Sequence, residues 1–306
     1  MKNIVLGSTG VKVPAIAVGC MRLNGIDAQA RKRFIMSAVE QGMYFFDHAD
    51  IYGGGVCETL FGEAVGELSL PREKLFLQSK CGIVPGVMFD FSEKHIIESV
   101  EGSLRRLKAD HLDSLLLHRP DALIEPEEVA SAFEKLEKEG KVRFFGVSNM
   151  HPMQIELIAG AVKQPLVADQ LQFSPTNASM ISAGFEVNML TDGAVSRDGY
   201  VLDYCRLHHI TVQAWSPYQY GFFEGVYLGN PKFEELNRVI GEIGEKYGVE
   251  DVAIVAAWIL RHPAHMQMVT GTMNEKRLSA IAKGADITLT REEWYKIYLA
   301  AGHILP

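Results

Sequence analysis

The chain has 306 residues, of which 47% are hydrophobic and 22% charged, a balance typical of a globular protein with a sizeable core. Its formal net charge is −8 without a long run of either sign, which argues against nucleic acid or an anionic membrane surface as the main partner. The sequence lacks an apolar stretch long enough for a membrane span or a secretory signal, and the four cysteines form no CxxC pair. We therefore expect a cytoplasmic protein with reduced thiols.

Short apolar strands alternate with longer segments along the chain. Residues 4–13 predict a small N-terminal β-hairpin that turns at Ser8–Gly10. The strands that follow are expected at 15–19, 43–48, 74–80, 113–118, 142–148, 167–173, 211–216 and 267–271. Each is short and almost wholly apolar, which is typical of parallel strands covered on both faces.

The segments between the strands have helical periodicity. Helices are expected at 27–42, 92–110, 125–141, 151–162, 197–209, 232–248, 274–284 and 290–302. Ser92 is an expected N-cap, and a capping box joins Thr290 to Glu293 in the last helix. The one long irregular connection, residues 173–198, is of a length that is usually functional.

About eight βα units without an intervening linker predict an α/β fold. We expect a single (β/α)8 TIM barrel domain over residues 1–306, with the N-terminal β-hairpin and an extra C-terminal helix. A doubly wound sheet is the main alternative fold. In a barrel the active site lies at the C-terminal ends of the strands, so the residues at those ends are the candidates for chemistry.

Four residues at or just beyond these ends suit the donation of a proton to a carbonyl. Tyr52 is a poor acid at neutral pH, because the ordinary pKa of tyrosine is about 10. A nearby ammonium from Lys80 would stabilise the phenolate, and Asp47 would keep that lysine charged and oriented. His118 could hydrogen-bond the carbonyl oxygen of a substrate.

The segments FFDHADIYGGG, LFLQSK, SLLLHRPD, GKVRFFGVSN and QAWSP resemble successive signatures of the aldo-keto reductase superfamily. They occur in that family's order over nearly the whole chain. The resemblance places the family's catalytic tetrad on Asp47, Tyr52, Lys80 and His118. It also implies binding of NADP(H) without a Rossmann domain, and the sequence has neither a GxGxxG motif after the first strand nor a P-loop. The glycines 53–55 are expected to let the backbone turn tightly beside the tyrosine.

The same resemblance implies the residues around the nicotinamide ring. Ser148, Asn149 and Gln170 match the positions that hydrogen-bond the carboxamide. Trp215 matches the aromatic residue on which the ring stacks, and Ser216 and Pro217 follow it.

Residues 269–281 resemble the family's loop for the adenosine 2′-phosphate. Thr272, Asn274 and Arg277 stand at the expected positions, while Gly271 replaces a lysine found in many members. An arginine suits a phosphate dianion, so NADP(H) is preferred to NAD(H). Residues Met21 and Arg22 are expected near the diphosphate and the substrate.

The reaction implied is the reduction of an aldehyde or ketone carbonyl to an alcohol, with Tyr52 as proton donor. The expected partner is a small carbonyl compound, with no nucleic acid, membrane or metal ion, and the chain is expected to be a monomer or a weak homo-oligomer. Loops 81–91, 173–198 and 218–227 are aromatic- and methionine-rich and could wall the substrate pocket. Two alternatives remain: a metal-dependent barrel hydrolase using DHAD and His118, and a nicotinamide-binding regulatory or sensor subunit with little turnover.

Overall fold

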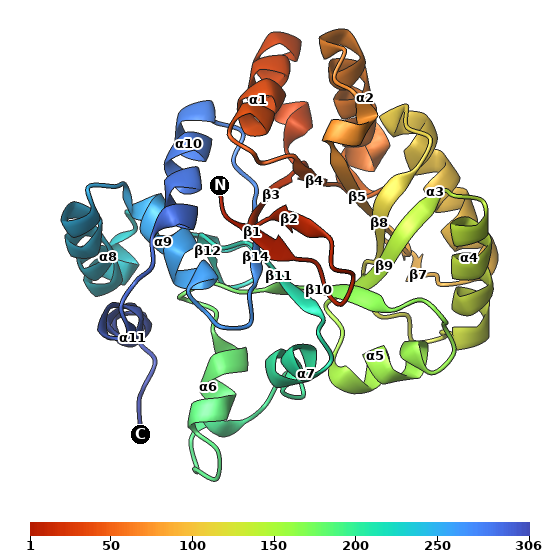
Figure 1. Ribbon diagram of the computed structural model, residues 1–306. Coiled ribbons are helices and arrows are strands. Elements are labelled where there is room, and N and C mark those ends of the chain that lie inside the picture. Colours follow the sequence, from red (N-terminus) through yellow and green to blue (C-terminus); the bar gives the residue numbers. More distant parts are fainter.

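The computed structural model describes all residues from 1 to 306. Eight parallel strands close into a barrel in the order β10, β11, β14, β3, β4, β5, β8 and β9, with β9 pairing back onto β10 (Figure 1). In chain order they are β3 (Ile16–Gly19), β4 (Phe45–Asp47), β5 (Phe76–Cys81), β8 (Leu112–Leu117), β9 (Val142–Ser148), β10 (Leu166–Gln172), β11 (Thr211–Trp215) and β14 (Gln267–Thr270). The predicted TIM barrel is confirmed, and the doubly wound alternative is wrong.

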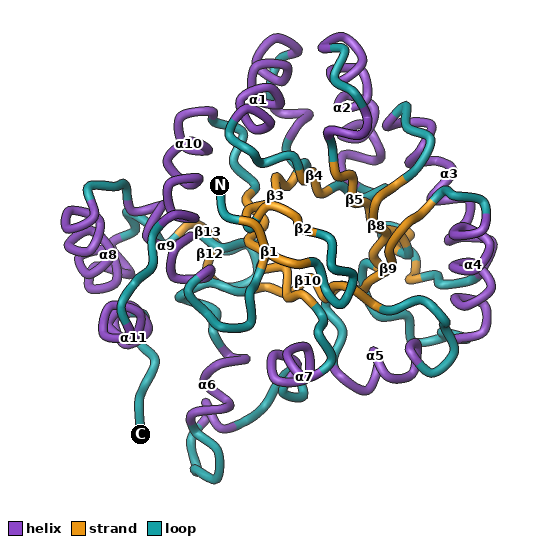
Figure 2. Tube along the Cα trace, viewed as in Figure 1, coloured by secondary structure: helices purple, strands orange, loops and turns teal.

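Helices surround the barrel on its outside (Figure 2). They are α1 (Ala28–Glu40), α2 (Val56–Leu68), α3 (Glu93–Leu107), α4 (Pro126–Lys138), α5 (Pro152–Ala159), α6 (Ser179–Phe185), α7 (Val201–Leu207), α8 (Glu234–Tyr247), α9 (Asp251–Leu260), α10 (Glu275–Lys283) and α11 (Arg291–Ala300). The expected helices are all present, although α7 is shorter than predicted. None of them combines the length and apolar character that crossing a membrane requires.

Three helices, α2, α6 and α9, were not predicted from the sequence. Helix α9 is buried along almost its whole length, from Ala253 to Leu260, so it has no polar face to produce a helical period. Helix α2 follows three glycines and contains Gly62 and Gly66, residues that lower helix propensity. Gly62 is needed here, because a Cβ at this position would lie 2.6 Å from the carbonyl oxygen of Arg106 at the end of α3.

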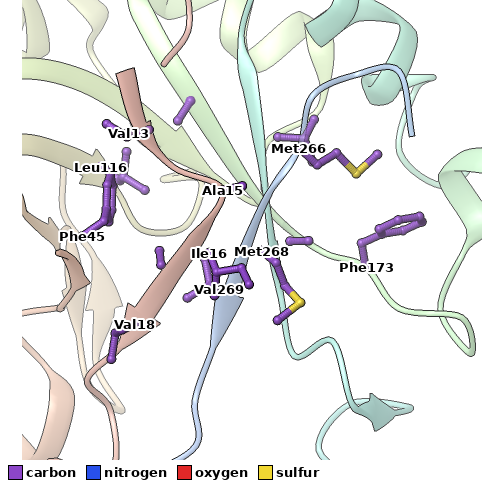
Figure 3. Packing of buried hydrophobic residues seen from close by; sticks show 14 of the residues in the cluster. Val13, Ala15, Ile16, Val18, Phe45, Leu116, Phe173, Met266, Met268 and Val269 are labelled. Carbon is purple, nitrogen blue, oxygen red and sulfur yellow. The ribbon is translucent and has the colours of Figure 1, made fainter. Parts of the chain in front are cut away.

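The predicted hairpin, β1 (Asn3–Val5) with β2 (Lys12–Pro14), lies across the N-terminal end of the barrel (Figure 1). At its turn the Gly7 amide donates to Thr211 Oγ1 at 2.7 Å, and a Cβ on Gly7 would lie 2.7 Å from the carbonyl oxygen of Val167. Val13 of the hairpin belongs to the same hydrophobic cluster as Phe45 of the barrel (Figure 3). The N-terminal end is therefore closed, and an active site must open at the other end.

The sequence suggested that the connection 173–198 is irregular throughout. The structure shows instead that it contains α6 and a 3₁₀ turn at Asp192–Ala194. Helix α6 packs on the C-terminal helix α11, where Ser182 and Tyr298 share a hydrogen bond of 2.8 Å. The expected capping box of α11 forms between Thr290 and Glu293. Loops 81–91 and 218–227 fold as two short hairpins, β6 (Ile83–Val84) with β7 (Met88–Phe89) and β12 (Gln219–Tyr220) with β13 (Gly225–Val226).

Candidate active site

A cavity of about 840 Å³ opens at the C-terminal end of the barrel. All predicted site residues except Lys80 and Asn274 line it: Met21, Arg22, Asp47, Tyr52, His118, Ser148, Asn149, Gln170, Trp215, Ser216, Pro217, Gly271, Thr272 and Arg277. Loop 81–91 contributes Ile83, and loop 218–227 contributes Phe223 and Val226. Loop 173–198 contributes nothing to this cavity, so the expectation that it helps to wall the pocket is wrong.

Lys80 lies beneath the cavity floor and holds Tyr52 from below. Its side chain is fully buried, and Nζ donates to Asp47 Oδ2 at 2.8 Å, to the His48 carbonyl at 2.7 Å and to Tyr52 Oη at 3.1 Å. Strand register explains the first contact. Asp47 on β4 pairs with Gln78 on β5, and Lys80 points to the same side of β5 two residues further along.

The glycine turn brings the phenol over this lysine. Tyr52 opens a 3₁₀ turn in which Gly53, Gly54 and Gly55 have φ values of 59°, 66° and 89°, a left-handed run that side chains oppose. A Cβ on Gly55 would also lie 2.9 Å from the Arg106 side chain. The predicted role of the glycines in shaping this turn is confirmed.

The electrostatics at Tyr52 differ from the sequence-based expectation. Burial raises the pKa of Tyr52 above its usual value, and the Lys80 ammonium opposes that rise without reversing it. The phenol is therefore protonated at neutral pH, as a proton donor must be. For Lys80, burial lowers the pKa, but Asp47 and Tyr52 raise it by more, so the net shift is upward and the ammonium stays charged.

The two histidines near the cavity are both neutral. Burial, and then Lys80, lower the pKa of His118 well below its usual range, and its ring centroid lies 6.1 Å from that of Tyr52. Nδ1 of His118 is buried without a partner. His48 packs edge-on against Phe61, away from the cavity, and burial followed by Lys80 lowers its pKa to about 3. Only His118 is placed to hydrogen-bond a ligand.

A chain of buried glutamines supports Asp47 from inside the barrel. Asp47 Oδ1 accepts from Gln78 Nε2 at 2.6 Å and from Gln170 Nε2 at 3.0 Å. The chain continues from Gln78 to Gln213 at 2.9 Å and from Gln213 to Gln267 at 2.8 Å. Sequence reasoning missed this network, since Gln78, Gln213 and Gln267 sit within apolar strands.

The residues expected at the nicotinamide end form a second hydrogen-bonded group. Trp215 Nε1 donates to Asn149 Oδ1 at 3.1 Å, and Asn149 Nδ2 donates to Ser148 Oγ at 2.7 Å. Ser148 Oγ donates in turn to the Gln170 carbonyl at 3.0 Å. Phe223, which the sequence did not single out, stacks on Trp215 with 5.8 Å between ring centroids. The indole is thus held by its nitrogen at one cavity wall.

Arg22, expected near the diphosphate, meets the loop expected to hold the adenosine 2′-phosphate, and not all of that loop's predicted residues line the cavity. Arg22 donates to the Gly271 carbonyl at 3.1 Å, and its guanidinium lies 3.1 Å from where a Gly271 Cβ would be. Arg277 lines the cavity and is exposed. Asn274 does not line it, because its side chain caps α10 by accepting from the Arg277 amide at 2.9 Å.

Arg119 is a further cation that the sequence analysis did not select. It follows His118, lines the cavity, is half-buried and forms no ion pair. Burial lowers the pKa of its guanidinium from its usual value. The sequence signal that could have identified Arg119 is its position directly after His118 at the end of a strand.

A charged lysine under a protonated tyrosine, beside a cavity with a fixed indole, suits an oxidoreductase that uses a nicotinamide cofactor. The aldo/keto reductase family model matches residues 15–299, and the chain belongs to that family. A 6-dehydroglucose reductase from Agrobacterium fabrum is 34% identical, with 98% of each chain covered. A putative voltage-gated potassium channel subunit beta from Schizosaccharomyces pombe is less similar, at 28% identity over 92% of this chain and 87% of its own. The crystal structure of the thermostable aldo-keto reductase Tm1743 with the inhibitor epalrestat has a TM-score of 0.79 at 26% identity, covering 98% of this chain and 100% of that one.

Proposed function

We propose that the protein reduces an aldehyde or ketone to an alcohol with NADPH, and that Tyr52 donates the proton to the carbonyl oxygen. The observation that carries the proposal is the 3.1 Å contact between Lys80 Nζ and Tyr52 Oη at the cavity floor. As negative charge leaves the carbonyl oxygen and reaches the phenol, the buried ammonium stabilises the phenolate that forms. Neutral His118 is the donor that orients the same oxygen.

The cavity residues fit a dinucleotide phosphate. Trp215 offers a ring face for the nicotinamide, and Ser148 and Asn149 offer polar groups for its carboxamide. At the other end Arg22 supplies a cation next to Gly271, and Arg277 supplies a second. Two guanidinium groups favour the extra phosphate of NADP(H) over NAD(H). When bound, NADPH would supply the hydride.

The substrate itself belongs to a class with polar groups near the carbonyl. Arg119 offers several N–H donors at the cavity wall, which suit hydroxyl groups or an anion. Since one relative is a 6-dehydroglucose reductase, a sugar that carries an aldehyde belongs in the substrate panel beside simple aldehydes and ketones.

Oxidation of NADPH with this panel tests the proposal. We expect multiple turnovers in the wild type and a loss of kcat of about 10²–10⁴-fold in Tyr52→Phe, the usual range for a proton donor. Tyr200→Phe, at an exposed tyrosine, is the matched control and should retain full activity. Binding of NADPH without turnover of any carbonyl would favour a regulatory subunit. Full activity of Tyr52→Phe with NADPH binding intact would refute the role of the phenol.

A further inference from the structure

A second cavity of about 430 Å³ lies outside the barrel, between α6, α7, the end of α9 and the start of α11. It shares no lining residue with the catalytic cavity. Two of its walls come from the segments that a plain barrel does not need, namely α6 within the connection 173–198 and the C-terminal helix α11. The long connection therefore builds a site of its own.

Three arginines, Arg206, Arg261 and Arg291, line this cavity. None of them has a carboxylate oxygen within 4.0 Å, whereas Lys32, Arg72, Arg106 and Arg238 each form an ion pair. Arg261 uses Nε to donate to the Leu289 carbonyl at 2.7 Å, which leaves its terminal nitrogens free. The only acidic lining residue is Asp203. In a chain of net charge −8, this is a local excess of positive charge.

Part of the lining is apolar and fixed in place. Trp294 is stacked on Trp258 with 4.9 Å between ring centroids, and each indole nitrogen donates to the other residue's carbonyl, at 3.0 and 3.1 Å. Phe185 of α6 packs against Tyr295 of α11, with 5.9 Å between their ring centroids. A flat apolar group can bind such a wall without ordering it first, which lowers the entropy cost of binding.

His262 adds a neutral donor to the lining, with its ring centroid 6.5 Å from that of Trp294. Its Nδ1 accepts from the Ala264 amide at 3.2 Å, so the ring proton resides on Nε2. Burial, and then Arg206, lower the pKa of His262 to about 4, so the ring is uncharged at neutral pH. Its N–H group supplements the guanidinium donors.

We infer that this cavity binds a small organic anion with a flat apolar body and one carboxylate or sulfonate group. The anionic group would lie among Arg206, Arg261 and Arg291, and the apolar body would lie against Trp294 and Phe185. The volume lies within the range of small-molecule sites. This site is separate from carbonyl reduction and does not depend on it.

Calorimetric titration with biphenyl-4-carboxylate tests the inference on the full chain, with biphenyl-4-carboxamide as its neutral counterpart. We expect saturable binding of the carboxylate and at least tenfold weaker binding of the amide, because charge-assisted hydrogen bonds to arginine are lost. The double variant Arg206→Glu/Arg291→Glu should also weaken the carboxylate at least tenfold. Both arginines are exposed and unpaired, so this variant should keep the fold, as thermal unfolding will show.

The control variant is Arg105→Glu, at an exposed arginine on α3 without an ion pair, which should change the affinity by less than twofold. The variant Arg119→Glu separates this cavity from the catalytic one, because it should weaken a carboxylate bound in the catalytic cavity and leave binding in this cavity unchanged. Equal affinity for the carboxylate and the amide, unchanged affinity in the double variant, or no saturable binding would each overturn the inference.

Discussion

Replacing Lys80 with methionine removes the charge at the centre of the proposed active site while preserving most of the side-chain volume. The change deletes hydrogen bonds of 2.8 Å to Asp47, 2.7 Å to the His48 carbonyl and 3.1 Å to Tyr52. Asp47 is then a buried carboxylate without its counter-charge. Breaking one side of a buried ion pair typically costs about 3–5 kcal/mol, so we expect a loss of that size in the free energy of unfolding.

The effect on catalysis should be larger than the effect on binding. Without the ammonium, the phenolate of Tyr52 is no longer stabilised, and kcat should fall by about 10²–10⁴-fold. Lys80 does not line the cavity, so the Kd of NADPH, followed by quenching of tryptophan fluorescence, should stay within about twofold. Lys94→Met, at an exposed lysine on α3, is the control for the substitution itself.

A second substitution tests whether the unpaired charge is the cause. Asp47→Asn/Lys80→Met removes the orphaned charge, while the asparagine oxygen can still accept from Gln78. The double variant should therefore recover at least about 1 kcal/mol of stability relative to Lys80→Met. If Lys80→Met unfolds within 1 kcal/mol of the wild type in urea, or if its kcat stays within fivefold, the reasoning from the buried pair is wrong.

The contribution of the Lys80–Asp47 pair to the free energy of unfolding should decrease at high pH. Because the folded-state pKa of Lys80 is raised, its contribution is fully present below pH ~10.5 and is lost as the pH rises through the folded value. The pair is thus intact throughout the neutral range, and the comparison of wild type with Lys80→Met is best made near pH 7.

Three further predictions concern the cofactor, pH and packing. Trp215→Ala removes the stacking face and leaves Asn149 Oδ1 without its donor, so NADPH should bind at least tenfold more weakly in a fluorescence titration; unchanged affinity would place the nicotinamide elsewhere. Burial raises the pKa of Asp169 to about 8, so the folded protein keeps this proton at a pH where the unfolded chain releases it. As the pH rises from 5 to 8, the free energy of unfolding of the wild type should therefore fall by up to about 1.4 kcal/mol per pH unit relative to Asp169→Asn. Urea stability curves that stay parallel for the two proteins across this pH range would contradict this. Gly62→Ala forces a Cβ to 2.6 Å from the Arg106 carbonyl and should lower the free energy of unfolding by about 1–3 kcal/mol; an increase in thermal stability would show that α2 and α3 can separate.

The sequence predicted the barrel and most of the cavity lining because both depend on local signals. Each strand is a short apolar run, and Tyr52, His118 and Trp215 stand at or just beyond strand ends, where a barrel brings side chains together. Helix α9 escaped prediction because burial on all sides removes the polar face that marks an amphipathic helix. Helix α6 has only seven residues and no side-chain cap at its N-terminus, so the sequence carries no capping signal that would have predicted it.

The parts that could not be predicted depend on contacts between distant residues. Gln78 and Gln213 are 135 positions apart, and nothing in either strand shows that their amides meet. The sequence correctly predicted that Lys80 lowers the pKa of Tyr52. It did not predict that the net shift is upward, because that depends on how deeply the phenol is buried. The role of the connection 173–198 depends on its packing against α11, at the far end of the chain.

The glutamine chain inside the barrel has a fixed amide orientation at every position. At one end Asp47 can only accept, so Gln78 must turn its NH₂ group toward the carboxylate. At the other end Gln267 must turn its NH₂ group toward the Pro14 carbonyl, at 2.7 Å. Gln213, between them, accepts from Gln78 and Gln170 and donates to Gln267. No single amide can rotate by 180° without placing a donor against a donor or an acceptor against an acceptor. The Asp47 carboxylate beside Lys80 and the hairpin at the opposite end of the barrel therefore hold one cooperative arrangement in place.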